Sequence, residues 1–218
     1  MASWLNKLTL LTTITLTCPA LAWQDSNGDE PQDELEAVQL YSDEQLVDMF
    51  DDNTHLYQVE TVDRCQLVMD IEAQAELEQR PTYQFLYGDM LAWGICYERD
   101  VELGLLYMQT AADQGLIQAL EQLGRYYHEG TLVQQDVDRA ILYLREAASL
   151  GHLPAQKRFA DIMLNGEGSP YDFTHAYHWL HNAVTGDEEE HQQIQQRLEQ
   201  LGQLMPASAV EKARQRSL

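Results

Sequence analysis

The chain has 218 residues and a mass of 25.0 kDa, enough for one domain with a hydrophobic core or for one short array of repeats. Its 36 Asp and Glu outnumber 13 Lys and Arg, a formal net charge of -23 that argues against nucleic-acid binding and against docking on an anionic membrane. Three cysteines are too few for a disulfide-dense miniprotein, and no run of 18 apolar residues offers a membrane-spanning helix.

Residues 1–22 have the features of a secretory signal peptide. Lys7 supplies the positive charge, residues 8–16 form a short apolar segment, and Ala20-Leu21-Ala22 fits a cleavage site, so we expect cleavage after Ala22. Lipidation at Cys18 is the weaker alternative, because Thr17 stands where a lipidated cysteine needs a small residue.

Export leaves two cysteines in the mature chain, Cys65 and Cys96. In an oxidising compartment we expect them to form one disulfide; two buried thiols are the alternative. Neither cysteine has a Cys or His neighbour at the spacing of a zinc site, and we expect no metal and no cofactor.

Residues 23–39 form an acidic leader that we expect to be disordered, since it is rich in Asp and Glu and poor in apolar residues. A calcium loop is the alternative, because acidic and amide side chains recur through the segment. Its sixth position is Glu30, where such a loop needs glycine for a sharp turn. The candidate ligands are Asp25, Asn27, Asp29, Asp33 and Glu36.

A 36-residue internal repeat is the dominant pattern of the remaining chain and is typical of a helical solenoid. Three copies cover residues 82–186, and the same residue types recur at the same places in each. The repeat-defining residues are Gly88, Gly94 and Asp100, then Gly124, Gly130 and Asp136, then Gly166 and Asp172.

Each copy is predicted to be two antiparallel helices. In the second copy, apolar residues recur at helical spacing on both sides of a turn that begins at Gly130 and ends at Asp136, an N-cap residue. The small residues at Gly124 and Ala140 let the paired helices approach closely. Since one pair cannot bury its apolar face alone, the pairs must stack.

Helical caps are expected at both ends of the array. In the N-terminal cap, residues 40–81, Ser42 and Gln45 fit a capping box for a helix to about Phe50, and residues 65–79 form a second helix. The C-terminal cap and basic tail, residues 187–218, begin with a helix to about Leu201, and Pro206 starts a last short helix. The fold class is therefore an all-α solenoid with capping helices.

The repeats resemble Sel1-like repeats, a class related to tetratricopeptide units. The segment LGRYYHEGTLVQQDVDRAILYLREAASLG, from Leu123 to Gly151, follows the family pattern closely. The resemblance implies a Sel1-like (TPR-related) fold and a role in protein interactions.

A more extensive resemblance runs from about Leu40 to Pro206, through LYSDEQLVDMF, YQFLYGDMLAWGICYERDVELG and GSPYDFTHAYHWLHNAV. These segments are similar to a family of periplasmic proteins of sodium-driven polar flagellar motors. The resemblance implies a non-enzymatic component of the T ring at the basal body, with MotY-like and PomB-like proteins as partners and a role in recruiting and holding stators. It also implies a ring-like assembly in the periplasm.

No residues could be assigned to partner binding from the sequence. The turns around Cys96, Val133 and Pro170 are the candidates, because turns carry variable exposed chemistry; the alternative is that they only shape the solenoid. Two other functions compete with the motor role: an adaptor of another envelope complex, and a periplasmic hydrolase of the β-lactamase-like kind described for cysteine-rich Sel1-like proteins.

Catalytic motifs are absent from the sequence: it has no GxSxG elbow, HExxH pair, phosphate loop or dinucleotide fingerprint, and we expect no enzyme. Three histidines, His175, His178 and His181, recur every third residue. His175 and His178 could share a metal ion, but we favour an exposed polar face with His178 partly packed. Tyr107, Tyr143 and Trp179 are expected to lie in the core rather than to form a ligand cage.

Overall fold

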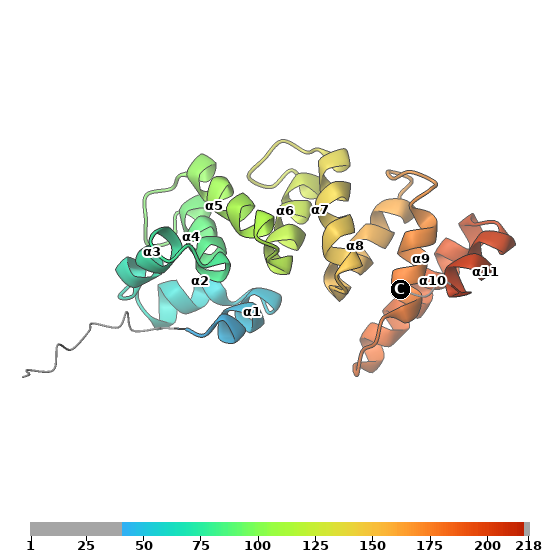
Figure 1. The fold of residues 1–218 in the computed structure, drawn as a ribbon, viewed down its shortest axis with the longest axis horizontal. Coiled ribbons are helices and arrows are strands. Elements are labelled where there is room, and N and C mark those ends of the chain that lie inside the picture. The colour runs from blue at the N-terminus through green and yellow to red at the C-terminus, as the bar shows by residue number, and fades with distance from the viewer. Residues whose placement is uncertain (1–40, 216–218) are drawn as a thin grey trace, which may run out of the picture. The chain divides into compact units, whose positions relative to one another are not determined.

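A computed structural model describes residues 41–215, and every regular element in that range is helical (Figure 1). The predicted all-α fold is thus confirmed, whereas the expected signal peptide and leader lie outside the described residues. The elements are α1 (Asp43–Asp51), α2 (His55–Tyr57), a π-helical turn (Gln58–Val62), α3 (Val68–Glu76), α4 (Pro81–Trp93), α5 (Val101–Asp113), α6 (Ile117–Glu129), α7 (Val137–Ser149), α8 (Leu153–Leu164), α9 (Phe173–Asn182), α10 (Glu188–Leu204) and α11 (Ala207–Gln215).

Three helical hairpins, α4–α5, α6–α7 and α8–α9, form the repeats and stack in chain order (Figure 1). Glycines allow the close approach within a hairpin. A Cβ placed on Gly88 would lie 2.6 Å from the carbonyl oxygen of Gly104, and one on Gly124 would lie 2.6 Å from Cγ of Leu144. These contacts are closer than side-chain carbons tolerate, so the distance between the two helices of each of these hairpins depends on the glycine.

The turn within each of the first two hairpins begins and ends on the residues that the repeat pattern selects. Gly94 and Gly130 cap α4 and α6 in the left-handed conformation, with φ of 74° and 73°. Asp100 and Asp136 are the N-caps of α5 and α7, and each carboxylate accepts a hydrogen bond of 3.0 Å from a backbone N–H three residues on.

The third hairpin departs from this scheme. Asp172 precedes α9, but its side chain makes no capping hydrogen bond. Both of its carboxylate oxygens accept hydrogen bonds of 2.9 Å from Arg145 of α7 instead. The same residue type thus caps a helix in two repeats and joins two repeats in the third.

The N-terminal cap contains the expected capping box, in which Ser42 and Gln45 bond each other's backbone N–H groups at the start of α1. Its second helix, predicted from residue 65, begins only at Val68. The difference has a local cause: Arg64 and Cys65 adopt positive φ angles of 53° and 58°, which a helix does not accommodate.

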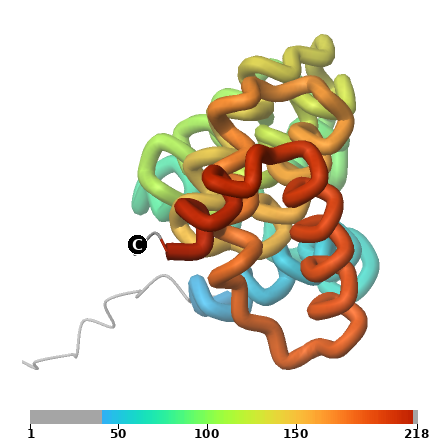
Figure 2. Tube along the Cα trace, turned by 90° about the vertical axis from the view of Figure 1, so that its right-hand side faces the viewer, coloured from blue at the N-terminus to red at the C-terminus, as the bar shows by residue number. Residues whose placement is uncertain are grey.

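The C-terminal cap contains both expected helices, α10 and α11. Asp187 caps α10, where its carboxylate accepts a 2.7 Å hydrogen bond from the Glu190 N–H, and three glutamates follow in the first turn. Helix α11 packs on α9 rather than continuing the stack beside α10. Figure 2, viewed from this end, shows α10 and α11 in front of the repeats.

The core follows the hairpins along the described chain. Its largest fully buried side chains are aromatic or long aliphatic, each worth about 1.5–3 kcal/mol of transfer free energy on burial. They include Tyr83, Tyr126, Phe85, Phe159, Leu46, Ile71, Leu86, Met90 and Met108.

Candidate protein-binding surfaces

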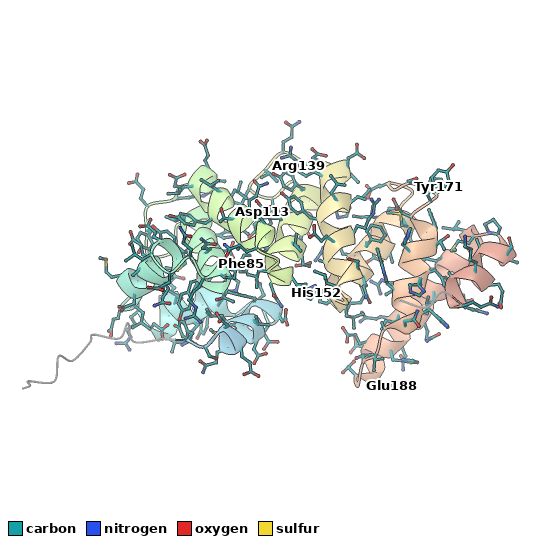
Figure 3. All side chains as sticks on the ribbon, in the orientation of Figure 1. Phe85, Asp113, Arg139, His152, Tyr171 and Glu188 are labelled. Atoms are coloured by element: carbon teal, nitrogen blue, oxygen red, sulfur yellow. A yellow bond between two sulfur atoms is a disulfide. The ribbon has the colours of Figure 1, made fainter. Side chains whose placement is uncertain are left out.

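The three intra-repeat turns lie along one edge of the stack, at the top of Figure 1. Figure 3 places Arg139 and Tyr171 at this edge and Glu188 at the opposite one. Tyr171, in the third turn, is 88% exposed. Beside the second turn, the guanidinium of Arg139 at the start of α7 lies 4.8 Å from the ring centroid of Tyr127 in α6 and donates a 2.9 Å hydrogen bond to its hydroxyl. The third turn and the helix ends beside the second turn therefore present aromatic and cationic groups at this edge.

The first turn differs because a disulfide bonds it to the N-terminal cap. Cys65 and Cys96 are bonded to each other, with Cα atoms 5.6 Å apart, and the bond joins the segment before α3 to the turn after α4. Tyr97 strengthens the same contact, since its hydroxyl lies 2.8 Å from Oε2 of Glu72 and 3.1 Å from the carbonyl oxygen of Val68. Cys96 thus fixes this turn to the N-terminal cap.

A cluster of tyrosines and glutamates covers the junction of α3, α4 and α5. The ring of Tyr87 contacts those of Tyr97 and Tyr107 edge-on, at centroid distances of 5.4 and 5.0 Å. Tyr107 donates a 2.9 Å hydrogen bond to Glu76. Burial, and then the negative charges of Glu72 and Glu76, raise the pKa of Tyr87 to about 12. The cluster therefore places three tyrosine rings beside two negatively charged carboxylates.

Exposed leucines mark the outer face of the second helix in the first two repeats. Leu106 of α5 is 60% exposed and Leu142 of α7 is 63% exposed. On α5 the leucines border a shallow groove whose lining contains no basic residue. The lining residues are Asp100, Glu102, Leu103, Leu105, Leu106 and Gln109.

A buried polar network lies between the N-terminal cap and the first two repeats. Nε2 of His55 lies 2.7 Å from Asp89 Oδ2, and both side chains are 2% exposed. The second oxygen of Asp89 accepts a 2.9 Å hydrogen bond from Tyr126, whose own oxygen accepts from Trp93 and Gln122. Burial, and then the charge of Asp89, raise the pKa of the Tyr126 hydroxyl. Sequence reasoning missed this network, because His55 and Tyr126 lie 34 and 37 residues from Asp89 and the three residues match no motif.

The three histidines of α9 occupy different environments. His181 is exposed, His175 is half-buried beside Trp179, and His178 is 2% exposed, so the expectation that two of them face solvent holds only for His181. The Nδ1–H of His178 donates a 2.9 Å hydrogen bond to the carbonyl oxygen of Ala213 in α11. Helix α11 is thus the cause of the unexpected burial.

The residues expected in the core of the second helices differ in depth. Trp179 is 8% exposed, whereas Tyr107 and Tyr143 are half-buried and direct their hydroxyls to Glu76 and Gln109. Across residues 41–215, no three His, Cys, Asp or Glu side chains converge as a metal site would require. In the same range, no helix combines the length and apolar character needed to cross a membrane.

Comparisons with known proteins agree with the predicted repeats. The model of the Sel1 repeat matches residues 81–116, 117–152 and 154–187, which are the three predicted copies, and also residues 20–42. The 36-residue period did not include this last segment, most of which lies outside the described residues. The sodium-type polar flagellar protein MotX of Vibrio parahaemolyticus serotype O3:K6 (strain RIMD 2210633) is 52% identical over 181 residues, 83% of this chain and 85% of that protein.

The chain is a Sel1-repeat protein of the MotX family. Solved structures agree on the fold. A Sel1 repeat protein from Oxalobacter formigenes is 25% identical, with a TM-score of 0.52 over 59% of this chain and 97% of that one. A protective antigen of uropathogenic Escherichia coli with the SLR fold is 23% identical, with a TM-score of 0.56 over 78% of this chain and 37% of that one. The fold of this MotX-family chain is therefore the fold of other Sel1-repeat proteins.

Proposed function

We propose that this protein is a non-enzymatic structural component of a sodium-driven flagellar motor. The observation that carries the proposal is the 52% identity to a sodium-type polar flagellar protein, which extends over 85% of that protein's length. The matched length exceeds what the Sel1 repeats alone would account for, since it also requires similarity in parts of the caps. In this role the chain acts by holding other proteins.

We further propose that the chain is exported to the periplasm, lies in the T ring at the basal body, and bridges a MotY-like protein to a PomB-like stator subunit. The structure is compatible with such a bridge, because an array of stacked hairpins offers several separate surfaces along its length. The edge that carries Arg139 and Tyr171 and the outer face of α5 are distinct surfaces of this kind.

Deletion of the gene in the native host, with electron microscopy of the same cells, tests the proposal. We expect intact flagella that do not rotate, because the stators are not held. Re-expression of the full chain should restore swimming and serves as the control. Normal swimming after deletion, in a host with no second copy of the gene, contradicts the motor role and favours an adaptor of another envelope complex.

Two measurements on the purified protein test export and the competing hydrolase function. N-terminal sequencing should begin at Trp23, and a chain that begins at Met1 contradicts export by cleavage. Incubation with a β-lactam tests the competing hydrolase, which requires turnover; an intact β-lactam is the result expected of a structural component.

A further inference from the structure

The C-terminal helix α11 covers the outer face of α9, the second helix of the third hairpin. Ala213 of α11 is fully buried and accepts the hydrogen bond of His178, while Arg214 donates a 3.0 Å hydrogen bond to the hydroxyl of Tyr177. The guanidinium of Arg214 also lies 5.8 Å from the centre of the Tyr177 ring. An amphipathic helix with a small residue toward α9 and a basic residue beside it therefore occupies this face.

The same face is open in the first repeat. The 36-residue period aligns His178 with Leu142 and Leu106, and aligns Tyr177 with Ile141 and Leu105. His178 is 2% exposed under α11, whereas Leu106 is 60% exposed. Leu105 and Leu106 border the shallow groove along α5, at the positions that α11 covers on α9.

Charge distinguishes the open face of α5 from that of α7. Helix α5 has no Lys or Arg, and Asp100 and Glu102 border its groove. Within residues 41–118, sixteen Asp and Glu accompany three basic residues, Arg64, Arg80 and Arg99. On α7, Arg139 and Arg145 belong to the helix itself, and Arg145 is held by Asp172 of the next repeat.

From these observations we propose that the outer face of α5 binds a short, basic, amphipathic helix of a partner protein, in the way that α11 covers α9. Small apolar residues of that helix pack on Leu103 and Leu106, and its Lys or Arg side chains pair with Asp100 and Glu102. Burial of the two leucines supplies the affinity, and the acidic border excludes acidic helices. The inference rests on the proposed function in one respect, namely that the partner is a component of the motor.

The test uses a photoreactive phenylalanine analogue in the full chain, expressed in cells that carry the complete motor. Placed at position 106, it should cross-link to one partner segment, and mass spectrometry should identify a helix rich in Lys or Arg with a small-residue face. Position 142 is the matched control, because Leu142 has nearly the same exposure and the same place in its repeat but basic neighbours, and no such cross-link is expected there.

A charge substitution gives a second measurement. Leu106→Lys should reduce the amount of protein that co-isolates with basal bodies about tenfold, as for an anchor residue at the centre of an interface, and Leu142→Lys should leave it unchanged. Both side chains are largely exposed, so both variants should keep the melting temperature of the parent.

The outcomes separate the two proposals. If the unmodified chain fails to co-isolate with basal bodies, the motor role is contradicted. If it co-isolates normally but position 106 gives no cross-link, gives the same cross-link as position 142, or captures an acidic segment, the α5 inference alone is overturned.

Discussion

At the scale of single residues, Tyr87 and Tyr107 lie against the carboxylates of Glu72 and Glu76. Tyr107 donates a hydrogen bond to Glu76, and burial together with that bond raises the pKa of Tyr107 to about 12. The pKa of Tyr87 is raised to the same value by burial and by the charges of Glu72 and Glu76. The folded state therefore favours the neutral phenols more strongly than the unfolded chain does.

Stability should consequently fall at alkaline pH. Below pH 10, the ordinary tyrosine pKa, both phenols are neutral in either state and the contribution is fully present. As the pH rises from 10 toward 12, the unfolded chain loses these protons first, which favours unfolding. Glu76→Gln should lower the pKa of Tyr107 toward 10, as measured from tyrosinate absorbance. An unchanged titration in this variant would contradict the assigned role of the Glu76 charge.

Gly88 is a position at which one added methyl group should lower the stability of the fold. A Cβ there would lie 2.6 Å from the Gly104 carbonyl oxygen and 2.9 Å from Cγ of Met108, so Gly88→Ala must push α4 and α5 apart. We expect a loss of about 1–3 kcal/mol in the free energy of unfolding, as for other overpacked sites. Urea unfolding measures it. The control is Gly186→Ala, where the added Cβ meets no atom within 4 Å, and a similar loss there would argue against the steric explanation.

At the scale of helices and turns, the sequence was sufficient to predict helix caps and turns whose hydrogen-bonded atoms are close in the chain. The capping box of Ser42 and Gln45 and the turn from Gly130 to Asp136 depend on contacts within a few residues. Asp172 has the same local sequence signal as Asp136, yet its carboxylate binds Arg145, which lies 27 residues away.

The elements that sequence reasoning missed depend on distant contacts. Helix α2 has only three residues, and its His55 is held by Asp89 of α4. The burial of His178 depends on Ala213, which lies 35 residues further along the chain. The proposed surface on α5 could not be predicted either, because the exposure of Leu106 becomes informative only when α11 is seen to cover the equivalent residue.

The disulfide acts at the scale of elements, because it joins the segment before α3 to the turn after α4. A link across 31 positions should contribute about 3–4 kcal/mol by restricting the unfolded chain. We expect the double substitution Cys65→Ser and Cys96→Ser to lower the free energy of unfolding by this amount in urea. Adding a reductant to the parent protein should reproduce the loss, and a parent protein indifferent to reductant would show that the bond does not form in solution.

At the scale of the described array, the contacts lie mainly within each hairpin and between neighbouring hairpins, so a change at one end is expected to leave the other end intact. The N-terminal end is held by the disulfide and by the contact of His55 with Asp89. The C-terminal end is held by α11 on α9 and by the ion pair of Arg197 with Asp161. Stability is therefore distributed along the chain, with separate attachments at each cap.

Removal of α11 tests this separation. A chain ending at Met205 loses the contacts of Ala213 and Arg214 with α9 and exposes the faces of Tyr177 and His178. Hydrogen exchange should then become faster in α9 and α10 and remain unchanged in α4 and α5, because α11 packs mainly on α9, and α9 in turn packs on α10. The cysteine double variant should give the opposite pattern. Faster exchange along every helix in either variant would mean that the array opens as one cooperative unit, and the surfaces on α5 and α9 could not then be altered independently.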